Sequence, residues 1–386
     1  MLEAVFDAIE TNRQANRGLP GSAYTSDSFF DWECRNVFEQ GWFALAFGAD
    51  APSPGDLFPV EVLGMSFIVA RGEDMELRVF HNVCRHRGRR LVDGPAHGAR
   101  LIRCPYHAWT YRLDGRLQGT PHIGGPGVHD VCGFAREDHS LFEVPSATWL
   151  DIVFVNPGGG AGAFADHVAP LAARLDSLWG AGGGSQLASA ADCAIVMTVE
   201  SNWKLALENY LEAYHLPFVH PGLNRYSPLA EHYIFADAAG FAGQGVTRYR
   251  PTLAARALPS LPSWPIERRE TAEYPALYPN ALLGIQHDHL FAMLLIPQGP
   301  QRTLERVAIQ FVGHAATDEA WAETRRAVCA GWREVFEEDV AAVEGMQAGR
   351  RCGAFDGGVF TPVLDVATAH FHRWYTAQVA GLGAGS

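Results

Sequence analysis

The stretch "CRHRGRRLVDGPAHGARLIRCPYHAW" (residues 84–109) decides the fold of the first half of the chain, because it holds two closely spaced pairs of metal ligands. One residue separates Cys84 from His86, and two residues separate Cys104 from His107. Two thiolates and two imidazoles can bind one zinc ion tetrahedrally. They can also bind a [2Fe–2S] cluster in which two His replace two Cys on one iron. The spacing favours the cluster, because two short loops on separate hairpins can clamp it between them.

The residues around this stretch predict a small antiparallel β domain over residues 41–155. Short runs of alternating polarity are separated by turn sequences such as "RGED" and "LDG". The runs are "DLFPVEVLG", "MSFIVARGEDMELRVFHNV", "LIRCPYHAWTYRLDGRLQG" and "TWLDIVFVNPGGG". The glycine-rich "NPGGGAGAF" that follows them indicates a domain boundary or a surface loop.

The remaining residues predict an α+β organisation. Residues 1–40 are expected to form a helical lead-in that packs on the second domain, with Ser26 or Ser28 as a helix N-cap. Residues 156–386 are expected to form that second domain. Its strands are predicted in "DCAIVMTVESNWK", "ALLGIQHDHLFAMLLIPQGP" and "TLERVAIQFVG", and its helices in "LENYLEAYHLPFVH" and over residues 317 to about 349. Such runs indicate helices packed on an antiparallel sheet.

Composition limits the possible functions. The chain has 386 residues, of which 48% are hydrophobic and 19% charged, so two globular domains are expected. The formal net charge of −13 argues against a nucleic-acid partner. We expect no signal peptide and no membrane span, because the longest apolar run is far too short. Seven Cys without a framework spacing indicate reduced thiols in the cytoplasm. The five outside the ligand pairs are predicted to be packing residues: Cys34, Cys132, Cys193, Cys329 and Cys352.

The two ligand pairs carry a family resemblance. "CRHRG" and "CPYHAW" resemble the C-x-H-R-G and C-P-Y-H-G-W motifs of Rieske oxygenase α subunits, with Ala108 where that family usually has Gly. By this resemblance, Cys84 and Cys104 hold one iron of a Rieske [2Fe–2S] cluster, and His86 and His107 hold the other. Imidazole ligands raise the reduction potential to roughly −150 to +300 mV, so a ferredoxin or flavin donor can reduce the cluster. Three nearby histidines outside the motif are predicted to be loop residues: His81, His97 and His122.

A second set of ligands lies in "NWKLALENYLEAYHLPFVHPGLN" (residues 202–224). On a helix, Glu208, Glu212 and His215 would share one face, and Pro217 would then end the helix. His220 could return from the following turn. Two imidazoles close together invite a carboxylate, which gives the 2-His-1-carboxylate triad of mononuclear non-haem Fe(II). That triad leaves coordination positions open for O2 beside a substrate.

This stretch also resembles the Rieske oxygenase family, in the pattern N-W-K-x(3)-E-N-Y-x-E-x-Y-H-x(4)-H. The resemblance implies that His215 and His220 are iron ligands. It implies that Asp339 is the third ligand, by the pattern E-D-x(7)-Q-x-G in the C-terminal segment. Glu212 is then a bridge between a catalytic-domain His and a Rieske His of a neighbouring subunit. Asn209 is expected to help shape that junction, and the alternative for Asn209 is a helix-capping or surface role. The alternatives to Asp339 are Glu337, Glu338 and Glu344.

The resemblance further implies a fold, partners and an activity. The second domain is expected to have a helix-grip (START-like) fold with an antiparallel sheet and a long C-terminal helix. The chain is expected to be the terminal oxygenase of a multicomponent system, arranged as a head-to-tail homotrimer with electron transfer between subunits. A separate flavin- or ferredoxin-type NAD(P)H reductase would supply the electrons, because "GGPG" and "GGG" do not fit a nucleotide-binding motif. O2 would be the co-substrate.

The substrate is the least determined feature. Family members with Glu at the bridging position resemble oxygenases of quaternary ammonium compounds such as choline, glycine betaine, carnitine and proline betaine. Aromatic residues of the second domain could hold such a cation: Tyr210, Tyr214, Phe218, Tyr226, Tyr233, Phe241, Trp264 and Phe291. The alternative enzyme hydroxylates an aromatic ring or removes O- or N-methyl groups from an aromatic acid. The non-enzymatic alternatives are a Rieske electron carrier and a zinc-stabilised binding module.

Two further stretches contain closely spaced histidines. "QHDHL" places His287 and His289 two positions apart between apolar runs, which predicts packing, a hairpin end or pocket lining in preference to a metal site. "HFHRWY" (residues 370–375) is predicted to lie on the surface of a C-terminal helix and to contact another subunit.

Overall fold

A computed structural model of the chain describes residues 2–236, 239–251 and 256–383. Its contacts divide the chain into two compact units. The β unit consists of residues 44–160, and the α+β unit consists of residues 1–43 together with residues 161–386. The helical N-terminal segment therefore groups with the C-terminal part of the chain.

The β unit contains three small antiparallel sheets, and residues of β2 to β7 share one hydrophobic core. Their strand orders are β1-β10-β9, β2-β3-β4-β8 and β5-β6-β7. The strands are β1 (Phe43–Phe47), β2 (Leu57–Val62), β3 (Met65–Arg71), β4 (Leu77–His81), β5 (Ile102–Arg103), β6 (Thr110–Tyr111), β7 (Leu117–Gly119), β8 (Glu143–Val144), β9 (Ser146–Trp149) and β10 (Ile152–Val155). The predicted antiparallel β domain is confirmed. His97 and His122 lie outside strands as predicted, but His81 is the last residue of β4, so its assignment to a loop is wrong.

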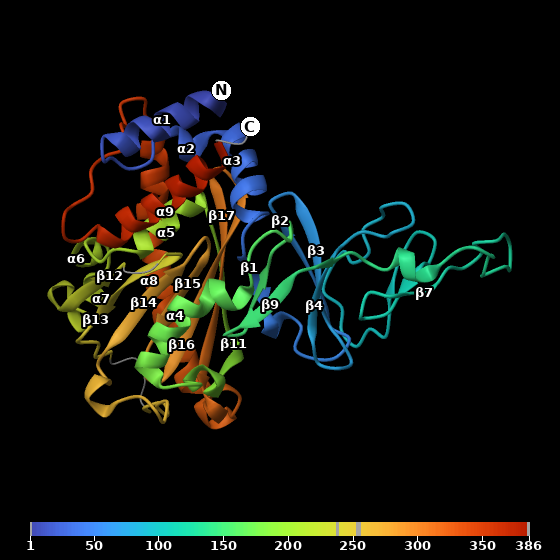
Figure 1. Cartoon of the computed structure of the whole chain (residues 1–386). Helices are drawn as coiled ribbons and strands as arrows, with labels where there is room; N and C mark the ends of the chain where they lie inside the picture. Colours follow the sequence, from blue (N-terminus) through green and yellow to red (C-terminus); the bar gives the residue numbers. More distant parts are fainter. Residues whose placement is uncertain (1, 237–238, 252–255, 384–386) are drawn as a thin grey trace. The chain divides into compact units, whose positions relative to one another are not determined.

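The α+β unit is built on one antiparallel sheet with the order β11-β17-β16-β15-β14-β13-β12 (Figure 1). The strands are β11 (Leu187–Val199), β12 (His232–Phe235), β13 (Phe241–Val246), β14 (Ala272–Leu277), β15 (Ala281–Ile285), β16 (His289–Gly299) and β17 (Arg302–Val312). The longest of them, β11, β16 and β17, overlap the three stretches predicted as strands. β11 begins five residues before its predicted stretch, and Trp203 and Lys204 at the end of that stretch belong to a helix. The expected α+β fold class is confirmed.

The helices of this unit are α1 (Leu2–Gln14), α2 (Ser22–Thr25), α3 (Asp27–Glu33), α4 (Phe164–Trp179), α5 (Trp203–Tyr210), α6 (Leu216–Val219), α7 (Pro221–Tyr226), α8 (Ala322–Arg350) and α9 (Val366–Gly383). The side chain of Ser26 accepts the N–H of Phe29 and caps α3, as predicted for one of the two candidate serines. Helix α1 contacts α9, and Tyr375 of α9 donates to Glu33 of α3, so the N-terminal helices lie beside α9 (Figure 1). The expected long C-terminal helix is α8.

Helices cover both faces of the sheet. Glu273 and Tyr274 are adjacent on β14, so their side chains point to opposite faces. Arg174 of α4 donates two hydrogen bonds to Glu273, at 2.7 and 2.8 Å, which places α4 on one face. Tyr274 faces a cavity that residues of α5 and α8 also line, which places those helices on the other face. The functional side chains therefore gather between the sheet and the α5–α8 pair.

The helix predicted through Pro217 is interrupted. Helix α5 ends at Tyr210, so Glu208, Glu212 and His215 do not share one helical face, and that prediction is wrong. Side chains replace the backbone hydrogen bonds that would extend α5. The carboxylate of Glu212 accepts the N–H groups of the second and third residues after it. The Gln244 amide donates to the carbonyl oxygens of Tyr210 and Glu212, at 3.1 and 3.0 Å.

The same interruption changes the role of the proline. Pro217 stands in the first turn of the short helix α6, where a missing N–H costs nothing. It therefore begins a helix and does not end one. Glu208 points away from this turn, and its carboxylate accepts the Tyr24 hydroxyl at 2.6 Å and lies 3.1 Å from His372 Nε2.

Helix α9 is buried along one face. Phe371, His372 and Tyr375 are buried, so the surface prediction for residues 370–375 is wrong for them. They pack against the N-terminal helices and α5, because the backbone N–H of Leu19 donates to His372 Nδ1 and the ring of Trp203 contacts Phe371.

The cysteines outside the ligand pairs divide into two groups. Cys34, Cys193 and Cys329 are buried, as expected of packing residues. Cys132 and Cys352 are exposed, so the packing prediction is wrong for both, and each lies outside helices and strands.

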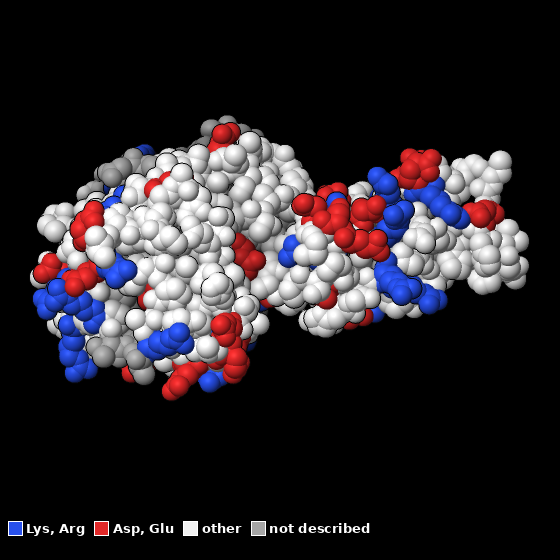
Figure 2. Space-filling model, turned by 90° about the horizontal axis from the view of Figure 1, so that it is seen from below, with Lys and Arg blue, Asp and Glu red and all other residues white. Residues whose placement is uncertain are grey.

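Surface properties add two observations. Among the described residues, none of the helices has both the length and the apolar character that crossing a membrane requires. Acidic and basic side chains are interspersed on the face shown in Figure 2, where the described residues form no broad surface of one sign.

A fully buried ion pair ties α5 to the N-terminal helices. Lys204 Nζ lies 2.5 Å from Glu33 Oε1, and neither side chain is exposed. The hydroxyl of Tyr375 on α9 donates to the same carboxylate. Burial raises the pKa of Glu33 and lowers that of Lys204, while each charge offsets part of the shift of the other. Four rings surround the ammonium within 6 Å: Tyr24, Phe29, Trp203 and Tyr375.

We expect Lys204→Met to lower the free energy of unfolding by about 3–5 kcal/mol, because Glu33 would remain as a buried charge without its partner. The measurement is urea denaturation of the full chain followed by tryptophan fluorescence. Adding Glu33→Gln should restore part of the loss. Arg13→Met, which breaks an exposed ion pair with Glu10, is the control and should leave stability unchanged. A Lys204→Met protein as stable as the wild type would contradict this role.

Candidate metal centres

The two Cys–His pairs lie in matching loops of the β unit. The first pair follows β4, and the second lies in the turn between β5 and β6. In each loop the carbonyl oxygen of the Cys accepts the N–H of the residue four positions later. The donors are Gly88, at 2.9 Å from the oxygen of Cys84, and Ala108, at 3.1 Å from that of Cys104. The two loops therefore present their ligands from the same kind of turn.

The four ligand side chains fit a [2Fe–2S] cluster better than one zinc ion. The thiols of Cys84 and Cys104 are buried, and the rings of His86 and His107 have centroids 4.7 Å apart. Burial and the neighbouring His107 lower the pKa of His86, which favours the neutral imidazole that binds a metal. Two thiolates and two imidazoles are the ligands of a Rieske-type [2Fe–2S] cluster, in which two His replace two Cys on one iron.

Tyr111 is a residue of this centre that the sequence did not indicate. Its buried hydroxyl accepts the N–H of Arg85 at 3.0 Å and lies 3.3 Å from Cys84 Sγ. Because the oxygen already accepts a hydrogen bond, its own hydrogen is free to point at the sulfur. Burial and the Cys84 thiol raise the pKa of Tyr111, so the hydroxyl stays protonated. Hydrogen bonds to cluster sulfurs influence the reduction potential.

Ala108 departs from the family motif at a position with a backbone constraint. Its φ is +57°, and the equivalent Gly88 in the other loop has a φ of +71°. Left-handed backbone suits Gly and strains a residue with a Cβ. The turn that presents Cys104 and His107 is therefore strained at this alanine.

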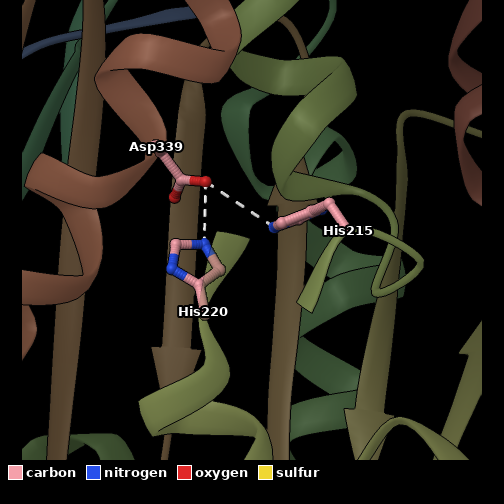
Figure 3. Close-up of side chains that lie close together, drawn as sticks. All are labelled: His215, His220 and Asp339. Carbon is pink, nitrogen blue, oxygen red and sulfur yellow. Dashed lines mark hydrogen bonds and ion pairs between the residues drawn. The ribbon is translucent and has the colours of Figure 1, made fainter. Parts of the chain in front are cut away.

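In the α+β unit, His215, His220 and Asp339 form a compact donor set. Asp339 Oδ1 lies 2.9 Å from His220 Nε2 and 3.6 Å from His215 Nε2 (Figure 3). The three ligand atoms all lie within 4.8 Å of one another. The histidines come from the turn after α5 and from the junction of α6 and α7, and the aspartate comes from α8. This arrangement fits a 2-His-1-carboxylate metal site.

A second carboxylate holds each imidazole. Glu212 Oε1 lies 2.6 Å from His215 Nδ1, and Glu338 Oε2 lies 2.7 Å from His220 Nδ1. A carboxylate at Nδ1 keeps the proton on that nitrogen and leaves the Nε2 lone pair for a metal. Burial lowers the pKa of His220, but Asp339 and Glu338 outweigh burial and raise it. Glu338, an alternative to Asp339 in the sequence, lies on the far side of the ring.

The other expected residues have distinct positions. Asn209 is buried near the end of α5 and donates to Asp339 Oδ1 at 2.8 Å, so it contacts the donor set directly. The alternative acids Glu337 and Glu344 lie outside the donor set. Glu337 is exposed and 3.8 Å from Arg333, and Glu344 accepts the N–H of Glu200.

A cavity of about 80 Å³ opens beside the donor set. By this measure a water molecule needs about 10–15 Å³, so the cavity can hold several waters or a small organic molecule. Residues of one face of α8 line it opposite strands of the sheet. Its aromatic lining is Tyr210, Tyr274, Phe291, Trp332 and Phe336. Of the eight aromatic residues expected from the sequence, only Tyr210 and Phe291 are among these lining residues.

The remaining aromatic lining depends on contacts that the sequence does not reveal. Trp332 and Phe336 are one turn apart on α8 and stack with centroids 5.8 Å apart. His289 Nε2 accepts the indole N–H of Trp332 at 2.9 Å, and Asp288 holds the other ring nitrogen at 2.7 Å. His289 therefore positions a cavity wall and starts β16, in agreement with the expected packing or hairpin role. Its neighbour His287 pairs with Ser260.

Both units match known families. Residues 187–381 match the family described as ring hydroxylating alpha subunit (catalytic domain), and residues 41–131 match the Rieske [2Fe-2S] domain. The carnitine monooxygenase oxygenase subunit of Escherichia coli K12 is 27% identical over 381 residues, which cover 94% of each chain. The glycine betaine monooxygenase oxygenase subunit of Chromohalobacter salexigens is 26% identical over 97% of this chain and 88% of that protein.

A solved structure supports the same similarity. The quaternary ammonium Rieske monooxygenase CntA, crystallised with an inhibitor, superposes with a TM-score of 0.76 at 25% identity. The match covers 93% of this chain and 94% of CntA.

We expect Ala108→Gly to stabilise the cluster loop by about 1 kcal/mol, because it removes a side chain from left-handed backbone. The temperature at which the visible absorption of the cluster is lost should rise by about 2–6 °C. Ala135→Gly is the control, because Ala135 is a loop residue of the same unit with an ordinary φ of −83°. It should lower that temperature or leave it unchanged. Destabilisation by Ala108→Gly would show that the strain is absent.

Proposed function

Because the chain belongs to the ring-hydroxylating α-subunit family and carries that family's Rieske [2Fe–2S] domain, we propose that it is the terminal oxygenase for a quaternary ammonium compound. It would use O2, and electrons from a separate flavin- or ferredoxin-type NAD(P)H reductase, to hydroxylate or N-dealkylate the substrate in the cytoplasm. One observation carries this proposal: a 2-His-1-carboxylate donor set opens into a cavity lined by five aromatic side chains.

The donor set has the chemistry that mononuclear Fe(II) requires. Fe(II) held by His215, His220 and Asp339 would supply a centre with open positions at which O2 can be activated. Glu212 and Glu338 orient the two imidazoles through their Nδ1 atoms and keep both Nε2 lone pairs directed at one point. Asn209 holds the Asp339 carboxylate with a hydrogen bond at 2.8 Å. These contacts preorganise the ligands before a metal binds.

Aromatic walls suit a quaternary ammonium group. Such a cation has no N–H, so it gives up no donated hydrogen bond to water when it enters the cavity. Ring faces can attract it, at about 0.5–2 kcal/mol per contact. Two relatives support this substrate class, since they are named for carnitine and glycine betaine. The alternative aromatic acid has weaker support, because no Lys or Arg is among the described residues that line the cavity.

Glu212 is suited to couple this centre to a Rieske cluster. One carboxylate oxygen holds His215, and the side chain is partly exposed. Two large residues beside it are exposed, Tyr214 at 47% and Phe218 at 79%, which supports burial of this surface against another subunit. We propose a homotrimer in which the carboxylate also accepts a hydrogen bond from His86 or His107 of a neighbouring subunit. The non-enzymatic alternatives offer no reason for the second donor set.

We expect His215→Ala to lose the mononuclear iron and to keep the visible absorption of the cluster. Metal analysis should give about three irons per chain for the wild type and about two for the variant. Glu337→Gln, an exposed acid of α8, is the control and should retain all of the iron. Loss of the cluster absorption in His215→Ala would refute the assignment of this histidine to a separate centre.

The substrate class is tested with a panel and a surrogate reductase. Choline, glycine betaine and carnitine would be compared with benzoate and phenylpropionate, and product would be measured because NADH loss also reports uncoupled O2 reduction. We expect oxygenated or dealkylated product from at least one quaternary ammonium compound. Product from the aromatic acids alone would refute the proposed substrate class.

Glu212→Gln should keep both metal centres and lose turnover about 10–100-fold, because the carboxylate charge is gone.

A further inference from the structure

The cavity contains a carboxyl group that the metal-binding set does not use. Glu305 lies on β17, directly opposite Leu295 of β16. Residues of β16 on the same face, Phe291 and Met293, line the cavity with it. The Glu305 side chain is buried, at 6% exposure. Among the residues that the structure describes, no group donates a hydrogen bond to its carboxyl or forms an ion pair with it. The strand therefore directs an unpaired acid into the substrate cavity.

An isolated buried carboxylate is unfavourable unless a positive group accompanies it. Burial raises the pKa of Glu305, because it disfavours the charged form of the carboxyl group. No Lys or Arg is among the described lining residues, so the protein supplies no such partner in the cavity. A cation in the cavity would supply the missing charge and favour the ionised form.

The remaining lining narrows the kind of cation. Five rings surround the cavity, and the neighbouring apolar lining includes Leu282, Met293 and Val343. A primary ammonium or a guanidinium would lose several hydrogen bonds to water on entering such a site. A quaternary ammonium has no N–H, and both ring faces and a nearby carboxylate attract it. The chemistry of the cavity therefore matches a trimethylammonium group.

We propose that Glu305 is the counter-charge for the ammonium group of the substrate and that it selects quaternary ammonium compounds over neutral and anionic ones. This inference rests on the proposed function and assigns substrate selection to one residue. The donor set lines the same cavity. A cation held by Glu305 would therefore place the carbons bonded to its nitrogen near the metal that the donor set would hold. Glu305 is thus a specificity-determining residue, distinct from Glu212, which holds His215.

The proposal is tested by equilibrium binding to the iron-loaded protein under anaerobic conditions. The probes are choline and glycine betaine, each compared with the neutral-headed isostere in which carbon replaces nitrogen. The wild type should bind each cation at least about tenfold more tightly than its isostere. Glu305→Gln should weaken cation binding about tenfold and leave isostere binding unchanged, and Glu305→Asp should keep much of the preference.

Controls separate this effect from damage to the fold. Glu337→Gln makes the same chemical change on an exposed part of α8 and should bind like the wild type. Iron content and cluster absorption report whether each variant is intact. If Glu305→Gln loses iron, equal affinity of the wild type for cation and isostere would still overturn the inference.

Two results would overturn the inference. One is equal affinity of the wild type for cation and isostere, and the other is cation binding by an intact Glu305→Gln protein within about twofold of the wild type. If the wild type converts a quaternary ammonium compound and Glu305→Gln does so equally well, only the role of Glu305 fails. If the wild type neither binds nor converts any quaternary ammonium compound, the proposed function fails as well.

Discussion

The α+β unit depends on the convergence of two distant segments on Asp339 Oδ1. This atom lies 2.9 Å from His220 Nε2, 119 positions away in the sequence, and 2.8 Å from the amide of Asn209. Helix α8 must therefore lie against α5 and the turn after it with little freedom. The opposite side of α5 is fixed by Lys204, which is fully buried against Glu33. Polar contacts on both sides of one short helix thus set the geometry of the donor set.

Side-chain hydrogen bonds create the turn that carries the histidines. In a continuous helix the positions of His215 and His220 would be set by the helix geometry, whereas α5 ends at Tyr210. Glu212 contributes twice, because its carboxylate accepts backbone N–H groups of the turn and also holds the His215 ring. Glu212, for which we propose a role in electron transfer between centres, therefore also stabilises the turn that carries His215. Gln at this position would have one acceptor oxygen in place of two, so it could not accept both the backbone N–H groups and the His215 ring.

Two electrostatic effects oppose each other in the cavity. Aromatic faces and Glu305 attract a substrate cation, whereas a positive metal ion at the donor set would repel it. Asp339 and Glu305 line the same cavity, so a cation bound there would lie near both carboxyl groups. A buried acid such as Glu305 destabilises the protein when no cation is bound beside it. Binding of a quaternary ammonium group would remove that cost, which couples recognition of the substrate to the order of the site.

The sequence by itself predicted both sets of ligands, because ligand motifs are local: Cys84 and His86, like Cys104 and His107, lie within a few residues of each other. It also predicted the α+β class, since strand and helix periodicities are local as well. It could not determine where α5 ends, because Gln244 from a distant strand competes for the backbone of that turn. It did not single out Glu305, although a lone acid on the buried face of β17 breaks the apolar alternation and could have been noticed.

Only the tertiary structure decided which acids and rings surround the metal site. Glu338 and Asp339 are adjacent in sequence, and packing of α8 against the histidines places one at Nδ1 and the other at Nε2 of the same ring. Trp332 lines the cavity because His289 of β16 holds its indole N–H. These assignments depend on long-range packing, in which residues far apart in the sequence share one buried space, and no local pattern encodes that sharing.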